Sequence, residues 1–211
     1  MKICIIGPPG AGKGTYAAEL AKKHKIPAIS IGRELRKMVN TKFGKMLKER
    51  YWGKGDLIPS KYAMDILKKN ITEKGYIIDG FPREVREAEM FEKVDKLDAV
   101  IFIKVSKKTI LDRLHGRLQC RKCGRVYHIR NKPPKKDKLC DKCKVELYER
   151  TDDKEERIVK ERFKVYHEET EPVIDYYRRK GLLREVSGED SIPEVVRNIE
   201  KAIRQKQTLK A

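Results

Sequence analysis

Hydrophobic residues in this chain form short apolar runs that alternate with longer segments in which apolar positions recur every three or four residues. Short apolar runs bounded by turn residues are typical of buried parallel strands, and the longer segments are typical of helices that cover a sheet. The alternation therefore predicts an α/β fold in which helices cover both faces of a five-stranded parallel sheet. The predicted strands are residues 2–7, 26–29, 76–78, 99–105 and 182–186.

The helices predicted from the same pattern differ in how well their ends are marked. Ser191 and Glu194 have the spacing of a capping box, which places the start of the last helix. The predicted helices are residues 13–25, 30–51 with a break near Gly44, 60–70, 85–96, 109–118, 153–180 and 192–204.

Two stretches interrupt this alternation. Residues 31–55 are helical and basic, and residues 117–150 contain four paired cysteines and no convincing strand. We expect both to be insertions that project from a core made of residues 1–30, 56–116 and 151–211.

The composition narrows the classes of partner. The chain has 211 residues, of which 39% are charged, and its net charge is +19. This balance favours polyanionic partners, either nucleic acid or small phosphate compounds, although a solvated, thermophile-like surface also produces a high charge. The longest apolar run, residues 99–103, is far shorter than the roughly 20 residues that span a bilayer, and the N-terminus lacks a cleavable signal pattern. We therefore expect a soluble, cytoplasmic protein with no membrane partner.

Four of the five cysteines form two Cys-x-x-Cys pairs, and their spacing is typical of a four-thiolate zinc site. Because no position is left open for water, the metal is expected to be structural. A redox disulfide is the alternative interpretation. The expected ligands are Cys120, Cys123, Cys140 and Cys143, whereas Cys4 is expected to be buried in the core.

The segment from Gly7 to Thr15, GPPGAGKGT, joins the first predicted strand to the first helix. Its glycines let backbone N–H groups point inward, where phosphates bind. Lys13 is expected to contact the β- and γ-phosphates, and Thr15 a phosphate or Mg²⁺. The match to the consensus G-x-x-x-x-G-K-[ST] is imperfect, because Gly14 stands where the hydroxyl residue belongs. The loop predicts nucleotide binding and leaves the reaction open.

This loop, together with the DGFPR motif that ends at Arg83, closely resembles the adenylate kinase family of nucleoside monophosphate kinases. Similar stretches continue through residues 30–36, 112–117, 123–134 and 150–153, so the resemblance covers nearly the whole chain. It implies a P-loop fold and reversible phosphoryl transfer from Mg²⁺-ATP to AMP, giving two ADP. It also implies that residues 31–55 bind the monophosphate nucleotide and that residues 117–150 form a lid over the triphosphate.

The resemblance further implies site residues, position by position. Several are arginines, whose planar guanidinium groups bind phosphate oxygens in pairs. Those expected to take part in phosphoryl transfer are Lys13, Arg83, Arg117, Arg150 and Arg162. Those expected to bind ATP are Gly10, Ala11, Gly12, Lys13, Gly14, Thr15, Arg113, Arg117, Val126, Tyr127 and Val186. Those expected to bind AMP are Ile31, Arg36, Asp56, Leu57, Ile58, Gly80, Phe81, Pro82, Arg83, Glu87, Arg150 and Arg162. Thr15 and Asp79 are expected to hold Mg²⁺ through water.

Four positions depart from the family pattern. Ile31 replaces a threonine that contacts the monophosphate nucleotide, and Arg33 replaces an acidic residue near the metal. Glu87 stands where a glutamine usually contacts the adenine edge, and an ionised carboxylate can only accept hydrogen bonds. The acceptor base is therefore left open. The stretch from residue 150 to 162 is one residue longer than usual, which makes Arg157 an alternative to Arg162.

Two alternative functions remain. One is a related phosphotransferase with another donor or acceptor base. The other is a P-loop ATPase whose zinc ribbon binds RNA or DNA. Aromatic residues for base stacking are sparse in the second insertion, which contains only Tyr127 and Tyr148. We therefore expect a monomer whose partners are ATP, AMP and ADP, rather than a nucleic-acid-binding protein.

Overall fold

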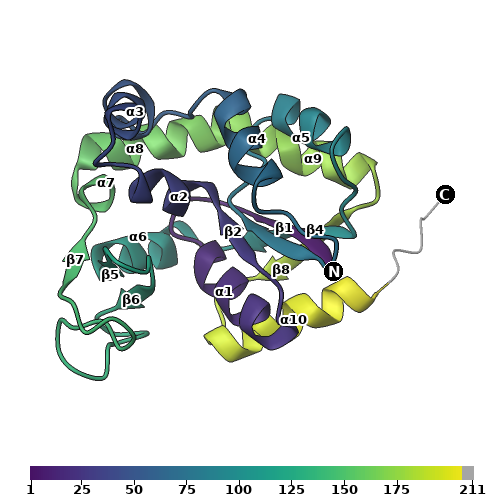
Figure 1. The fold of residues 1–211 in the computed structure, drawn as a ribbon. Coiled ribbons are helices and arrows are strands. Elements are labelled where there is room, and N and C mark those ends of the chain that lie inside the picture. Colours follow the sequence, from purple (N-terminus) through teal and green to yellow (C-terminus); the bar gives the residue numbers. More distant parts are fainter. Residues whose placement is uncertain (206–211) are drawn as a thin grey trace.

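The computed structural model describes residues 1–205 and has a five-stranded parallel sheet between helical layers (Figure 1). The sheet has the strand order β2-β3-β1-β4-β8, and every neighbouring pair is parallel. All five strands predicted from the sequence are confirmed, with ends shifted by at most two residues. Their bounds are β1 (Lys2–Ile6), β2 (Ala28–Ser30), β3 (Tyr76–Asp79), β4 (Ala99–Lys104) and β8 (Leu183–Ser187).

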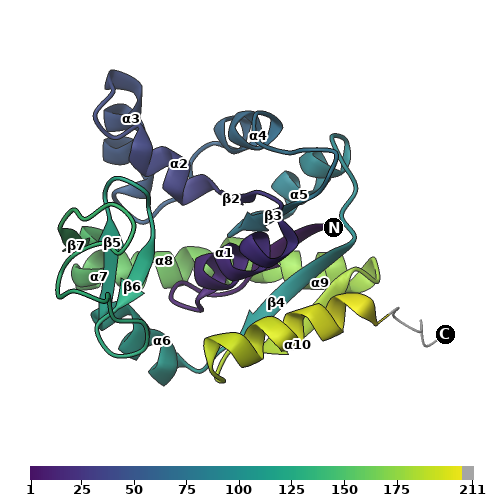
Figure 2. The ribbon, with the colours of Figure 1, turned by 60° about the horizontal axis from the view of Figure 1, so that its bottom comes forward.

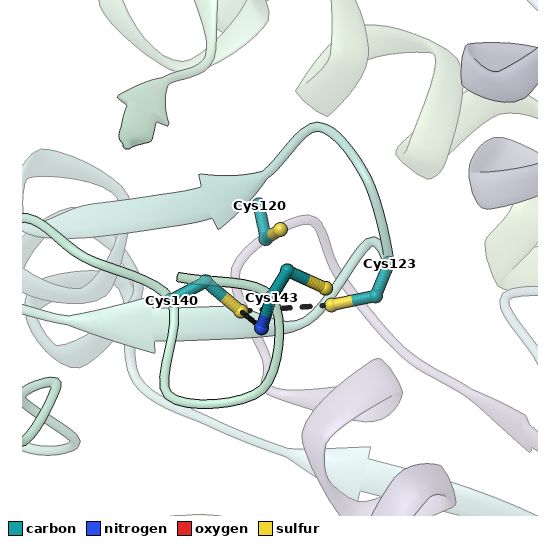
Figure 3. Close-up of side chains that lie close together, drawn as sticks. All are labelled: Cys120, Cys123, Cys140 and Cys143. Atoms are coloured by element: carbon teal, nitrogen blue, oxygen red, sulfur yellow. Dashed lines mark hydrogen bonds between the residues drawn. The ribbon is translucent and has the colours of Figure 1, made fainter. Parts of the chain in front are cut away.

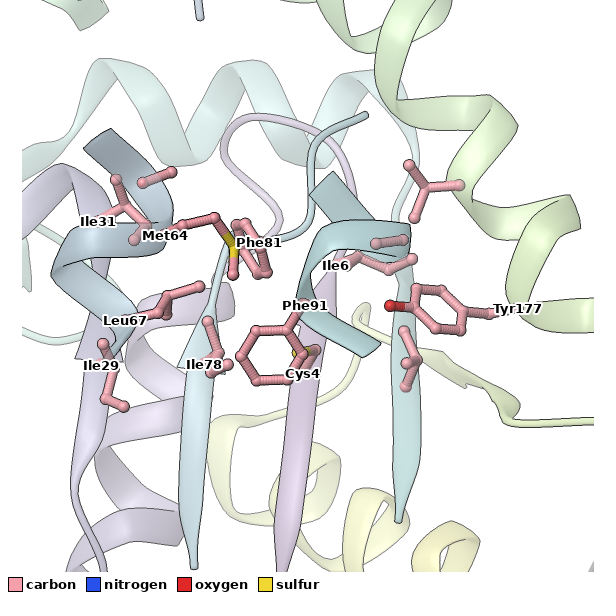
Figure 4. Packing of buried hydrophobic residues seen from close by; sticks show 14 of the residues in the cluster. Cys4, Ile6, Ile29, Ile31, Met64, Leu67, Ile78, Phe81, Phe91 and Tyr177 are labelled. Atoms are coloured by element: carbon pink, nitrogen blue, oxygen red, sulfur yellow. The ribbon is translucent and has the colours of Figure 1, made fainter. Parts of the chain in front are cut away.

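The two faces of the sheet are covered by different helices, because successive side chains of a strand point to opposite faces. Ile3 and Ile5 of β1 pack on α1 (Lys13–His24) and α10 (Ile192–Arg204). Cys4 and Ile6 pack on the other layer, which contains Phe91 and Tyr177 (Figure 4). That layer consists of α4 (Ser60–Lys68), α5 (Val85–Glu92) and α9 (Glu171–Arg179). Cys4 is fully buried, as expected.

The helices agree with the sequence prediction at most of their starts and less well at their ends. The Ser191–Glu194 capping box is present at the start of α10. Helix α6 (Lys107–His115) ends before the predicted residue 118. The long helix predicted over residues 153–180 is interrupted, because Glu155 adopts an extended conformation. It consists of α7 (Thr151–Lys154), α8 (Glu156–Val165), the π-helical turn η2 (Tyr166–Thr170) and α9.

The first insertion contains α2 (Ile31–Lys37), α3 (Lys42–Leu47) and the π-helical turn η1 (Lys48–Trp52). The predicted break is present, but it lies at residues 38–41 and Gly44 itself is inside α3. The Thr41 side chain starts α3 by accepting a hydrogen bond from the Gly44 N–H at 3.0 Å. A Cβ on Gly44 would lie 1.8 Å from the Met38 carbonyl oxygen, so this glycine permits close packing and does not end a helix.

The second insertion contributes no strand to the parallel sheet, but it contains three short strands that the sequence pattern did not predict. They are β5 (Arg117–Cys120), β6 (Val126–His128) and β7 (Leu147–Glu149), and they form a separate antiparallel sheet in the order β6-β5-β7. Figure 2 shows this small sheet to one side of the parallel sheet. Strands of three or four residues are too short to show an alternating pattern. In the described part of the chain, no helix is long and apolar enough to cross a membrane.

Candidate functional site

A cavity of about 1180 Å³ opens where the parallel strands end, between the loop that follows β1 and the two insertions. Ligands of open α/β sheets bind at this edge, because the loops that follow parallel strands all meet there. The cavity brings together most of the residues that the sequence predicts to bind ATP or act in transfer. The predicted ATP-binding and transfer residues that line it are Gly10, Gly12, Lys13, Gly14, Thr15, Arg83, Arg113, Arg117, Val126, Tyr127, Arg150 and Arg162. Residues predicted for AMP or Mg²⁺ also line it, namely Arg36, Leu57, Asp79, Gly80 and Pro82.

Lys13 begins α1 and points back over the loop. Its Nζ donates hydrogen bonds to the carbonyl oxygens of Gly7 at 2.7 Å and Pro8 at 2.8 Å. Desolvation lowers the pKa of Lys13 to about 7, against the opposing effect of the Asp79 carboxylate. A phosphate in the cavity would add a negative partner and keep the ammonium group charged.

Gly14 explains why the loop departs from its consensus. A Cβ at this position would lie 2.8 Å from Oδ2 of Asp79, the last residue of β3. The absent side chain therefore lets the Asp79 carboxylate approach the start of α1. As a result, the hydroxyl group of the loop is supplied by Thr15, one position later.

Three arginines and two aspartates form a buried cluster at the side of the cavity. The Arg117 guanidinium binds both carboxylate oxygens of Asp153, with its Nε 2.6 Å from Oδ2. Arg150 binds Asp152 in the same way, with its Nε 3.0 Å from Oδ1. Arg162 Nη1 donates to the Asp152 carbonyl oxygen at 2.6 Å and to Asp153 Oδ1 at 2.9 Å.

The charges in this cluster hold both aspartates ionised. Burial disfavours the ionised form of Asp152, but Arg150 and Arg162 outweigh this effect and hold its pKa well below the usual range. Arg117 and Arg150 likewise lower the pKa of Asp153. Two carboxylates cannot neutralise three arginines, so the cluster retains positive charge next to the phosphate loop.

Arg36, from α2, adds a fourth guanidinium group that has an unused donor. Its Nε atom is buried and has no hydrogen-bond partner within residues 1–205. Burial and the neighbouring Arg150 lower the pKa of Arg36 to about 9. A buried donor without an acceptor is unfavourable, and an anion such as a phosphate would satisfy it.

A smaller cavity of about 80 Å³ adjoins the cluster, and most of the residues predicted to bind AMP line it. Pro82 is the exception and lines the larger cavity. The sequence analysis missed Trp52, which also lines the smaller cavity and whose indole Nε1 is buried without a partner among the described residues. Trp52 is the only tryptophan and lies in a highly charged helical segment, which is the signal that could have identified it. The predicted AMP-binding residues that line the smaller cavity are Ile31, Arg36, Asp56, Leu57, Ile58, Gly80, Phe81, Arg83, Glu87, Arg150 and Arg162.

Glu87, on α5, is the most buried carboxyl group that lines this smaller cavity, with only 4% of its surface exposed. Its Oε2 accepts a hydrogen bond from the Arg83 backbone N–H at 2.8 Å. Burial nevertheless raises the pKa of Glu87 to about 7. The side chain can therefore be either neutral or ionised near physiological pH.

Other predicted residues lie elsewhere. Ala11 and Val186 line neither cavity and are buried in the core beneath α1 and α10. Arg157, the alternative to Arg162, lies on the exposed side of α8, so the structure brings Arg162 into the cluster instead. The Tyr127 hydroxyl contacts Cys140 Sγ at 3.5 Å and accepts a hydrogen bond from the Asp141 N–H at 2.9 Å.

The four paired cysteines come together in the second insertion (Figure 3). Their sulfur atoms all lie within 4.8 Å of one another, and Cys123 Sγ is 3.7 Å from Cys140 Sγ. A tetrahedron with zinc–sulfur bonds of about 2.3 Å has sulfur–sulfur edges of about 3.8 Å. All four are free thiols. The arrangement therefore fits a tetrahedral metal site and not a disulfide.

The two Cys-x-x-Cys pairs have matching backbone geometry. The Gly124 N–H donates to the Cys120 carbonyl oxygen at 2.9 Å, and the Lys144 N–H donates to that of Cys140 at 2.9 Å. Gly124 and Lys144 both adopt left-handed conformations, with φ of 70° and 57°. Burial would raise the pKa of Cys140, but hydrogen bonds from Tyr127 and backbone N–H groups lower it to about 6. A thiolate is the form that binds metal.

Comparisons with known proteins agree with this geometry. A family model described as "Adenylate kinase" matches residues 5–182. An adenylate kinase of Archaeoglobus fulgidus is 46% identical, and the alignment covers 95% of this chain and 96% of that protein. Adenylate kinases of Caldanaerobacter subterraneus and Thermotoga neapolitana are 45% and 43% identical, with coverage of 95% or more of each chain.

Proposed function

This chain belongs to the adenylate kinase family of phosphotransferases, and from that premise we propose that it transfers the γ-phosphoryl group of Mg²⁺-ATP to AMP, giving two ADP. The observation that carries the proposal is the positively charged arginine cluster between the phosphate loop and the smaller cavity. The loop and Lys13 would bind the triphosphate, and the smaller cavity would bind the acceptor nucleotide.

The transfer breaks the bond between the γ-phosphorus and its bridging oxygen and forms one to an oxygen of the AMP phosphate. That acceptor is already anionic, so no general base is required. The transition state spreads negative charge over the transferred group, and preorganised positive charge stabilises it. We assign this role to Lys13, Arg83, Arg117, Arg150 and Arg162. Arg36, with its unpartnered Nε, would hold the AMP phosphate.

Oxygen ligands at the edge of the phosphate loop fit a magnesium ion. Asp79 ends β3 beside Gly14, and the Thr15 hydroxyl belongs to the first turn of α1. We propose that both would hold Mg²⁺ through its water shell, since the ion keeps several waters when it binds nucleotides. When bound, the ion would neutralise part of the triphosphate charge.

The two insertions are proposed to be moving parts. Residues 31–55 would close over AMP and residues 117–150 over ATP, while the remaining residues form the core. Closure would complete the arginine cluster around the phosphates and exclude water, which protects the phosphoryl group from hydrolysis.

We propose that the four cysteines bind one structural zinc ion, which would give the small second insertion a fixed shape. Elemental analysis should therefore find close to one zinc per chain. Cys140→Ser should lower the unfolding temperature of the insertion before it affects nucleotide binding at the phosphate loop. An unchanged melting profile in chelator would contradict a structural metal.

A single assay series tests the activity. Purified protein is incubated with Mg²⁺ and ATP, and with AMP, CMP, UMP or GMP in turn, while diphosphate formation is followed. A parallel measurement follows phosphate release with and without RNA. We expect ADP formation with AMP and no stimulation by RNA. If no acceptor gave a diphosphate and RNA stimulated phosphate release, the kinase assignment would be wrong.

We also propose a cytoplasmic location, because none of the five cysteines forms a disulfide, as expected in a reducing compartment. That the enzyme acts as a monomer stays a prediction, which a mass measurement in solution would test.

A further inference from the structure

The smaller cavity combines two chemical environments. Arginines from three separate segments supply positive charge, and apolar side chains supply a surface for an aromatic base. Glu87 contributes a carboxyl group to the same lining. Asp152, which is partly buried there, is already paired with Arg150. Asp56 is more exposed than Glu87. Glu87 is therefore the buried acid that remains available to a bound base.

One oxygen of Glu87 is occupied and the other is not. Oε2 accepts the Arg83 N–H, whereas no donor within residues 1–205 bonds to Oε1. Oε1 is not completely buried either, so a ligand in the cavity can reach it. Oε1 is therefore the oxygen of Glu87 that can contact a base. Whether Oε1 donates or accepts a hydrogen bond depends on whether it carries a proton.

We infer that Glu87 binds the adenine of AMP as a neutral carboxylic acid, with Oε1–H donating to a ring nitrogen of the base. The inference rests on the proposed function, because it assigns the smaller cavity to the acceptor nucleotide. Adenine presents a ring-nitrogen acceptor next to an amino donor, whereas guanine presents two neighbouring donors on the corresponding edge. A neutral acid can donate to adenine, but an ionised carboxylate can only accept. The protonation state of Glu87 would therefore decide which purine is accepted.

The surroundings of Glu87 place this change near neutrality. Burial and the like charge of Glu84 raise the pKa of Glu87, whereas the Arg83 N–H and guanidinium group lower it. The resulting pKa is about 7. Helices α4 and α9, which pack on α5, present mainly apolar side chains to the core. The other charged groups that line the cavity are Arg36, Asp56, Arg150, Asp152 and Arg162.

The test compares wild-type protein with Glu87→Gln, whose amide donates at every pH. If only the neutral acid binds AMP, the wild-type KM for AMP should rise about tenfold between pH 6 and pH 8 relative to that of the variant. The comparison with the variant removes the titration of the AMP phosphate, which both proteins share. For GMP the trend should reverse, with weaker binding at pH 6 than at pH 8.

Glu84→Gln is the matched control, since Glu84 neighbours the site but lines neither cavity. Its KM for AMP should still rise with pH relative to that of Glu87→Gln, but the rise should begin at a slightly lower pH, because loss of the Glu84 charge lowers the pKa of Glu87. Calorimetry in two buffers of different ionisation enthalpy gives a second measurement that does not depend on turnover. At pH 7.5, AMP binding should take up more protons in wild type than in Glu87→Gln.

Two outcomes separate the inference from the proposed function. Parallel pH profiles of wild type and Glu87→Gln, with equal proton uptake, would overturn the role of Glu87 while leaving the kinase intact. Absence of ADP formation from AMP even at pH 6 would overturn the kinase function itself.

Discussion

The chemistry of single residues in the site has two sources, which are neighbours in the chain and packing between distant segments. Lys13 and the paired cysteines follow from spacing alone, because their chemistry depends on neighbours in the chain. The need for a glycine at position 14 does not follow from spacing. It comes from the Asp79 carboxylate, which β3 brings close to Gly14 from far away in the sequence. Trp52 and the altered pKa of Glu87 are also consequences of burial, which one sequence does not display.

Restoring the consensus hydroxyl at the phosphate loop should therefore impair the enzyme. In Gly14→Ser the new Cβ would lie 2.8 Å from Asp79 Oδ2, so that the carboxylate or the start of α1 must shift. Because a misplacement of about 1 Å at a reacting site can cost about 100-fold, we expect kcat/KM to fall by about 10- to 100-fold. Steady-state kinetics measure this, with Thr15→Ser as a control that keeps the hydroxyl and should stay active. Full activity in Gly14→Ser would show that Asp79 does not restrict this position.

Elements were predictable where a pattern extends over several residues. The five sheet strands and the capped start of α10 are examples. Short elements fixed by local contacts were not predictable: α3 begins at the Thr41 cap, and β5, β6 and β7 are held by the geometry of the cysteine pairs. The interruption at Glu155 comes directly after two aspartates that pair with the arginine cluster, and the sequence pattern shows neither these contacts nor the interruption.

The two cysteine pairs make one element-level prediction. Lys144 has a left-handed φ of 57° where its counterpart Gly124 has 70°. A side chain in this conformation costs about 1 kcal/mol, which glycine avoids. Lys144→Gly should thus raise the free energy of unfolding of the metal-loaded protein by up to about 1 kcal/mol. Denaturant unfolding measures this change.

Lys142→Gly is the matched control, because Lys142 is also an exposed lysine of this turn and does not have a positive φ. It should leave stability unchanged or lower it, since glycine gains flexibility in the unfolded chain. If Lys144→Gly were no more stable than Lys142→Gly, the left-handed conformation would not carry the assigned cost.

At the scale of the whole molecule, positive charge is concentrated in the two insertions. Residues 117–150 contain twelve Lys and Arg against four Asp and Glu, and residues 31–55 contain eight against two. Together they supply 14 of the 19 net positive charges. The insertions also approach one another, since a Cβ on Gly124 would lie 2.9 Å from Cδ of Arg33. Excess charge therefore lies on both sides of the cavity, where two nucleotide phosphates would meet.

This distribution predicts how salt should act on the enzyme. Screening shortens the range of exposed charges from about 10 Å at 0.1 M salt to about 3 Å at 1 M, while buried ion pairs such as Arg117–Asp153 are screened much less. Raising the salt concentration should therefore increase KM for AMP and for Mg²⁺-ATP several-fold and change kcat much less.

A variant with Lys135, Lys136 and Lys138 replaced by glutamine tests whether exposed charge causes this effect, because these exposed lysines line neither cavity. It should retain kcat and show a shallower dependence of KM on salt. An equally steep dependence would mean that attraction comes from the cavity arginines alone, and that the charge on the outer surface of the second insertion does not contribute to substrate capture.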